Sequence, residues 1–124
     1  MPHKDGSAYH PVVCTVSLGS SLCLDIYASD DGGYKENQLR SRIFQERRSL
    51  LITTGDIYNN YMHGIADITA DTDLGPDTVA NWSLLRAPDI VGGINKRTTR
   101  LSLTYRDVLK VVKLGNKFGL LSRR

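Results

Sequence analysis

The sequence predicts a mainly β protein of the jelly-roll type, and two observations support this prediction. Short apolar and β-branched runs recur along the chain, several of them with the two-residue alternation of a strand that has one buried face. Stretches rich in Gly, Asn and Asp separate these runs, and no long stretch has the period of a helix. About five strands joined by long loops therefore indicate a β-sandwich or barrel.

Residues 12–18 and 22–27 are the first two expected strands, and each alternates in the same way. Gly19-Ser20 lies between them and suits a two-residue turn, so we expect an antiparallel hairpin. In that hairpin Cys14 and Cys23 become diagonal neighbours roughly 7–8 Å apart. This is too far for an unstrained disulfide, and we therefore expect two reduced thiols.

The remaining elements follow from composition and from the length of each run. A polar, irregular stretch at 28–46 predicts a surface loop, and the β-branched run at 49–54 predicts a strand. Residues 57–62 have near-helical spacing and predict one helical turn. Residues 66–98 lack periodicity and are expected to be mostly loop, whereas the clear alternation at 98–105 predicts another strand.

The charge balance is mildly basic. Sixteen Lys and Arg against thirteen Asp and Glu give a net charge of +3, and the pI is near 9.0. This is short of the charge density of a dedicated nucleic-acid clamp, although it permits a polyanionic substrate. The chain has no run of 18 apolar residues and no signal-peptide layout, so we expect no membrane span and an intracellular protein.

A candidate metal site begins at the third residue. His3 and Asp5 are two residues apart, so on an extended segment both side chains project from the same face. Either His10 or His63 can supply a third ligand, and we favour His63, which follows an expected strand as a ligand on an opposite wall would. Two His and one carboxylate form the facial triad of non-haem Fe(II) oxygenases.

Two other interpretations of this pattern remain open. Zinc hydrolases use similar ligands, so the triad alone does not identify the metal. His-x-Asp can also occur by chance in a polar segment.

The expected strand at 98–105 carries a candidate anion clamp. Arg100, Ser102, Thr104 and Arg106 share one of its faces. The two Arg Cα atoms lie roughly 20 Å apart on an extended strand, and inward-leaning guanidinium groups can grip the two ends of one small dicarboxylate. The alternative is an ordinary solvent-exposed strand face. Iron together with a dicarboxylate cosubstrate indicates 2-oxoglutarate chemistry.

These motifs occur in an order that resembles the AlkB family of Fe(II)- and 2-oxoglutarate-dependent dioxygenases. The resemblance covers nearly the whole chain except residues 28–46 and 66–98. It rests on five strings: Met1–Gly6, Val16–Ser20, Arg48–Leu51, Met62–Ile65 and Arg100–Thr104.

The resemblance implies a double-stranded β-helix and a set of site residues. His3, Asp5 and His63 correspond to the family's iron ligands. Arg100, with Ser102 beside it, corresponds to the residue that binds the far carboxylate of 2-oxoglutarate. Arg106 corresponds to an Arg near the carboxylate that chelates iron.

Family members also carry an Asn and a Tyr shortly before His-x-Asp, together with N-terminal strands and a substrate-reading lid. None of these precedes His3. We therefore expect residues 1–124 to be the C-terminal part of a dioxygenase domain that is incomplete at its N-terminus.

The function that the resemblance implies is oxidative dealkylation, with N-alkylated nucleic acid as the leading substrate class, by a monomer of the cytoplasm and nucleus. The basic residues of the tail either touch phosphates or form a solvated end; they are Lys110, Lys113, Lys117, Arg123 and Arg124. One alternative is a catalytically inactive truncated isoform or fragment that acts only as a binding module. Another is a 2-oxoglutarate hydroxylase that acts on protein.

Overall fold

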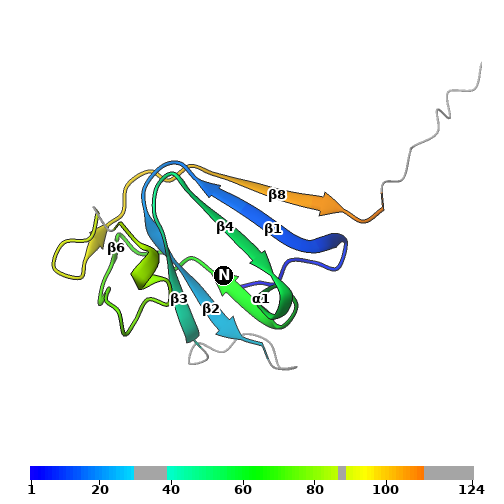
Figure 1. Cartoon of the computed structure of the whole chain (residues 1–124), viewed down its shortest axis with the longest axis horizontal. Coiled ribbons are helices and arrows are strands. Elements are labelled where there is room, and N and C mark those ends of the chain that lie inside the picture. The colour runs from blue at the N-terminus through cyan, green and yellow to red at the C-terminus, as the bar shows by residue number, and fades with distance from the viewer. Residues whose placement is uncertain (30–38, 87–88, 111–124) are drawn as a thin grey trace, which may run out of the picture.

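The computed structural model describes residues 1–29, 39–86 and 89–110, and these residues form a mainly β structure, as the sequence predicts (Figure 1). In chain order its elements are β1 (Tyr9–Ser17), β2 (Leu22–Ala28), β3 (Leu39–Gln45), β4 (Ser49–Thr54), α1 (Gly55–Asn60), β5 (Tyr61–Gly64), β6 (Ala70–Asp71), the 3-10 helix η2 (Trp82–Leu84), β7 (Asn95–Lys96) and β8 (Ser102–Val108).

Two three-stranded antiparallel sheets form the body of the protein. One has the order β4-β1-β8 and the other the order β3-β2-β5, while β6 and β7 form a separate two-stranded ribbon. The chain passes repeatedly from one sheet to the other, and side chains from both sheets line a common cavity. This arrangement has the jelly-roll character expected from the sequence.

The predicted hairpin between the first two strands is wrong. β1 pairs with β4 and β8, whereas β2 pairs with β3 and β5. The link between β1 and β2 crosses from one sheet to the other and is bonded to the segment before β8. The N–H groups of Leu18 and Gly19 donate to the carbonyl of Leu101, and the N–H of Ser20 donates to Thr99. Two-residue alternation reports which face of a strand is buried, but it does not identify the partner strand.

The two cysteines consequently lie in different sheets. Cys14 is cross-strand from Ile52 and Tyr105, and Cys23 is cross-strand from Phe44. Both thiols are free, as predicted, but the reason is their separation into two sheets rather than a diagonal register. Burial raises the pKa of the Cys23 thiol to about 11, which keeps it protonated at neutral pH.

The loop predicted at 28–46 is wrong at its end, because β3 occupies Leu39–Gln45. Arginines interrupt the apolar alternation of this strand, so the sequence did not indicate it. Arg42 is an example: its Nε lies 3.7 Å from a carboxylate oxygen of Asp25 on the neighbouring strand. The strand at 49–54 is confirmed. The helical turn predicted at 57–62 is present but lies two residues earlier, at Gly55–Asn60, and Tyr61 already belongs to β5. The last strand begins at Ser102, later than predicted. The tail beyond residue 110 lies outside the described residues.

The long segment 66–98 is mostly loop, as predicted, and it covers the outer face of the β3-β2-β5 sheet. A buried cluster joins the two: Cys23 and Phe44 of the sheet pack with Leu74 and Val79 of the loop. Partly buried apolar side chains of the same loop pack against this cluster, namely Trp82, Leu85 and Ile90. Burial of this apolar surface is the main force holding the loop on the sheet.

A buried ion pair ties the same loop to the start of β2. The carboxylate of Asp71 is fully buried and accepts hydrogen bonds from the guanidinium of Arg97, from Asn95 Nδ2 at 2.9 Å and from the Cys23 N–H at 3.2 Å. Asn95 Nδ2 also donates to the Ser21 carbonyl at 2.9 Å. Burial acts to raise the pKa of Asp71, but the bonds from Arg97 and Asn95 and the Arg97 charge outweigh it and hold that pKa below its usual range.

The β4-β1-β8 sheet has its polar face inward and its apolar face outward. Its outward side chains include Leu50 and Ile52 of β4 and Leu103 and Tyr105 of β8, each more than 40% exposed. They flank Cys14 and Val16 of β1 in register.

The helices of the described residues are all too short to span a membrane.

Replacing Gly19 by Ala is expected to destabilise the fold. A Cβ at this position would lie 2.5 Å from the Leu101 nitrogen and 2.6 Å from the Thr99 oxygen, and backbone atoms cannot move aside cheaply. We expect the free energy of unfolding to fall by about 1–3 kcal/mol, measured by denaturant titration. Gly75→Ala is the control, since a Cβ there meets nothing within 4 Å. Equal stability of the two variants would contradict the crossover packing.

Replacing Asp71 by Asn is expected to leave Arg97 buried without a countercharge. At pH 7 this should lower the free energy of unfolding by about 3 kcal/mol. Because the folded-state pKa of Asp71 is depressed, its contribution is complete above the unfolded pKa near 4 and is lost as the pH falls through the folded value. The difference in free energy of unfolding between the variant and the wild type should therefore become smaller below about pH 4. A difference that is the same at pH 3 and pH 7 would contradict this role of Asp71. Exposed Asp77→Asn is the control.

Candidate metal centre

A cavity of about 340 Å³ opens between the two sheets, and all six candidate site residues line it. They are His3, Asp5, His63, Arg100, Ser102 and Arg106. A larger hollow of about 760 Å³ lies beside the link between β1 and β2, but none of the six belongs to it. The chemistry-bearing residues that are remote in sequence therefore meet at the smaller cavity.

His3 is held beside His63 by the backbone. The His3 N–H donates to the His63 carbonyl at 3.0 Å, and the His63 N–H donates back to the His3 carbonyl at 2.9 Å. The two imidazole centroids are 4.6 Å apart. β5 positions His63, because that strand pairs with β2 and places His63 opposite Ile26. This reciprocal pair brings the start of the chain against the sheet.

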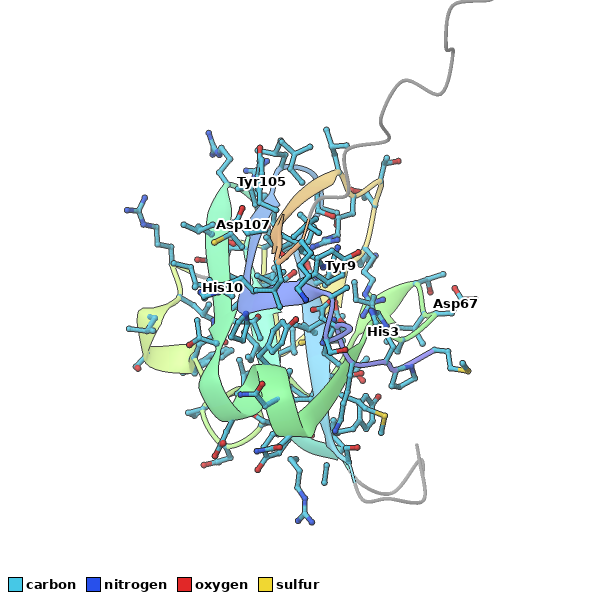
Figure 2. All side chains as sticks on the ribbon, turned by 90° about the vertical axis from the view of Figure 1, so that its right-hand side faces the viewer. His3, Tyr9, His10, Asp67, Tyr105 and Asp107 are labelled. Carbon is cyan, nitrogen blue, oxygen red and sulfur yellow. The ribbon has the colours of Figure 1, made fainter. Side chains whose placement is uncertain are left out.

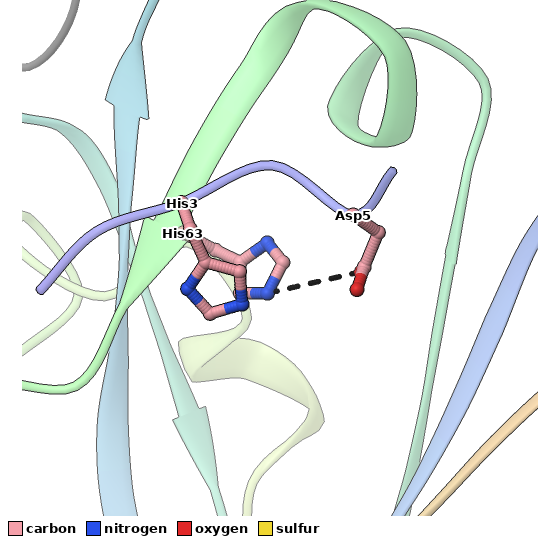
Figure 3. Close-up of side chains that lie close together, drawn as sticks. All are labelled: His3, Asp5 and His63. Carbon is pink, nitrogen blue, oxygen red and sulfur yellow. Dashed lines mark ion pairs between the residues drawn. The ribbon is translucent and has the colours of Figure 1, made fainter. Parts of the chain in front are cut away.

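Asp5 completes a compact group with the two imidazoles, as Figure 3 shows. One ligand atom from each of His3, Asp5 and His63 lies within 4.8 Å of the other two. An Asp5 carboxylate oxygen lies 3.8 Å from His63 Nε2. His10, the alternative third ligand, is exposed on β1, and Figure 2 shows it well apart from His3. The structure thus brings together the set with His63.

Electrostatics favour the neutral form of His63. Burial is the largest influence and lowers the pKa of this imidazole, and the charges of His3 and Arg106 act in the same direction. The Asp5 carboxylate opposes them without reversing the shift. Neutral imidazole is the form that binds a metal, so this environment prepares His63 as a ligand at neutral pH.

Two contacts that sequence reasoning missed hold the segment carrying His3 and Asp5. A Cβ on Gly64 would lie 3.1 Å from Pro2, a tight contact that would push the N-terminal segment a few tenths of an ångström away, so Gly favours this close approach to β5. The hydroxyl of Tyr58, buried on α1, donates to the Gly6 carbonyl at 3.0 Å. The Gly after His63 was the available signal for the first contact, whereas nothing in the sequence pairs Tyr58 with Gly6.

Arg100 projects into the cavity with only neutral partners. Its Nη1 donates to Ser102 Oγ at 2.8 Å, and its Nη2 donates to Gln45 Oε1 at 2.8 Å and to Ser17 Oγ at 3.2 Å. Its Nε is buried and has no hydrogen-bond partner. Burial lowers the pKa of this guanidinium, and the Arg97 charge adds to the effect. A half-buried cation with an unused buried donor attracts an anion.

Arg106 is in a different electrostatic situation. Its Nε and Nη2 lie 2.8 and 2.7 Å from one carboxylate oxygen of Asp5, and its guanidinium carbon lies 5.7 Å from the centre of the Tyr9 ring. The two arginines of the expected dicarboxylate clamp therefore differ in their present partners, and the clamp itself stays a prediction. Arg106 holds the carboxylate of the candidate metal ligand, while the Arg100 charge has no acidic partner among the described residues.

The donor set fits iron and an anionic cosubstrate. Two imidazoles and one carboxylate on neighbouring segments are the ligands of mononuclear Fe(II) sites with open positions. Zinc accepts the same ligands, so the geometry by itself leaves the metal open. The unused Nε of Arg100 on the same cavity matches a carboxylate-bearing partner for that metal.

Comparison with known proteins places the chain in a family. No family model matches it. An alignment of 119 positions, which covers 91% of this chain, is 37% identical to a protein of Danio rerio named "Probable RNA/DNA demethylase ALKBH6". The chain spans about half of that relative's length, 49%. Over the region that it spans, the chain belongs to the AlkB family.

Proposed function

We propose that this chain carries the Fe(II)- and 2-oxoglutarate-binding half of an AlkB-type dioxygenase that removes alkyl groups from nucleic acid. The observation that supports this most strongly is one cavity with two complementary features. The ligand atoms of His3, Asp5 and His63 lie within 4.8 Å of one another. The Arg100 guanidinium lines the same cavity, and no acidic side chain in the described part of the chain pairs with it.

The role proposed for each residue follows from its surroundings. His3, Asp5 and His63 hold the iron, and Arg106 orients the Asp5 carboxylate through its two short contacts. Arg100, with Ser102 beside it, binds the far carboxylate of 2-oxoglutarate. When bound, iron and 2-oxoglutarate supply the oxidation of a carbon attached to nitrogen, which is chemistry of the cofactor rather than of side chains.

Nucleic acid as the substrate class rests on the relative and on charge. The Danio rerio protein is named as an RNA/DNA demethylase, and the chain has a mildly basic pI near 9.0. Lys110 is exposed after β8; the other basic residues of the tail lie outside the described part. We further propose that residues 1–124 act as the C-terminal part of one catalytic domain, in a monomer of the cytoplasm and nucleus.

A second candidate function is a binding module without catalysis. The outward apolar face of the β4-β1-β8 sheet favours it, since an uncovered sheet face of this kind is typical of a surface that packs against another polypeptide. Under this alternative the chain binds Fe(II) weakly and does not turn over 2-oxoglutarate.

Anaerobic titration with Fe(II) and then 2-oxoglutarate tests the proposed function. We expect the weak visible charge-transfer band of the iron–2-oxo acid chelate, and we expect His63→Ala to abolish it because one of three metal ligands is lost. His10→Ala is the matched control and should retain the band, since His10 is exposed and outside the cavity. A folded wild-type chain that gives no band would favour the binding module. A band that persists in His63→Ala would show that His63 is not a metal ligand.

Replacing Arg100 by Met is expected to weaken 2-oxoglutarate binding roughly tenfold or more, because a charge-assisted hydrogen bond to the far carboxylate is lost. Fe(II) affinity should not change, since Arg100 is not among the clustered ligand atoms. Isothermal titration of each ligand separates the two effects. Arg40→Met, on an exposed position of β3, is the control. Equal 2-oxoglutarate affinity in both variants would contradict the assignment of Arg100.

A further inference from the structure

Gln45 is buried at the end of β3, and its amide lies against the Arg100 guanidinium. Only 4% of the residue is exposed, and it lines the cavity that also contains Arg100. Its Oε1 accepts a hydrogen bond of 2.8 Å from Arg100 Nη2 and one of 3.5 Å from Ser17 Oγ. Ser17 is 1% exposed and also accepts from Arg100, at 3.2 Å. Two buried neutral groups therefore fix one edge of the guanidinium.

Gln45 contrasts with the acidic partners of three other arginines in the described residues. Arg42, Arg97 and Arg106 each lie within 4 Å of a carboxylate oxygen. At Arg100 the corresponding acceptor is an amide oxygen. An amide orients a guanidinium as a carboxylate does, but it leaves the positive charge unbalanced. The cavity therefore keeps one full charge available for a ligand, and the free Nε supplies a donor for it.

We propose that Gln45 is a positioning residue that sets the charge preference of the cavity, so that it selects 2-oxo acids with a second carboxylate over those with only one. This inference rests on the proposed function. It assigns the preference to the neutral partner of Arg100 as well as to Arg100 itself. A Glu at position 45 would be isosteric with Gln, would pair with Arg100 internally and would repel the far carboxylate of the ligand.

The test compares two 2-oxo acids in the Gln45→Glu variant. Kd values for 2-oxoglutarate and for 2-oxobutyrate, which has a single carboxylate, are measured from the charge-transfer band of the anaerobic Fe(II) protein. We expect 2-oxoglutarate affinity to fall roughly tenfold or more, as for loss of an interaction with a charged group. The affinity for 2-oxobutyrate should change little, so the preference for 2-oxoglutarate, measured as the ratio of the two Kd values, should be largely lost. Asn59→Asp, the same amide-to-acid change on exposed α1, should keep the wild-type ratio.

A second variant covers the case in which Gln45→Glu does not fold. Gln45→Met keeps the side-chain length and removes the acceptor, so Arg100 loses its orientation but not its charge. We expect weaker binding of 2-oxoglutarate with the preference over 2-oxobutyrate retained. Binding as tight as in wild type would overturn the positioning role.

The outcomes separate this inference from the proposed function. A wild-type chain that binds Fe(II) and 2-oxoglutarate, with an unchanged Kd ratio in Gln45→Glu, would overturn the role of Gln45 alone. A folded wild-type chain that binds neither 2-oxo acid would overturn both. Fe(II) binding measured without any 2-oxo acid should be the same in wild type and both Gln45 variants, because Gln45 is not among the clustered ligand atoms.

Discussion

The positive charge of Arg100 is the constraint on which the arrangement of this protein depends. Its guanidinium is held between two sheets by Ser17, Gln45 and Ser102, and none of these residues carries a charge. Arg100 is half-buried, and a cation without a countercharge is costly there because part of its interaction with water is lost and not replaced in full. This cost arises at the cavity that also holds the His3, Asp5 and His63 cluster, where an anionic ligand would offset it.

This constraint accounts for the orientation of the β4-β1-β8 sheet, whose apolar face points outward rather than toward the other sheet. The β4-β1-β8 sheet directs polar side chains such as Thr15, Thr53 and Thr104 into the cavity, and its apolar side chains point outward. The other sheet contributes the apolar core on its outer face, where the 66–98 segment covers it and the Asp71–Arg97 pair fastens that segment. The space between the sheets therefore combines the polar and charged side chains of the candidate site with apolar ones such as Val13 and Leu24.

Much of the secondary structure could be predicted from sequence, because alternation of polar and apolar residues reports directly on strand faces. The partner of each strand could not, and the hairpin between residues 12–18 and 22–27 is wrong for that reason. The spacing of His3 and Asp5 and the position of His63 predicted a shared site, and the three side chains do lie together; their role as iron ligands stays a prediction. Gln45 was missed because its strand was expected to be loop.

The most direct measurement of the central claim is the NMR signal of the Arg100 Nε–H group, assigned by its disappearance in Arg100→Lys. The account predicts that adding a dicarboxylate 2-oxo acid to the metal-loaded protein moves this signal downfield and slows its exchange with water, since the unused donor gains a charged acceptor. Binding of the same ligand with no change in this signal would contradict the claim that the Arg100 charge is what the cavity offers.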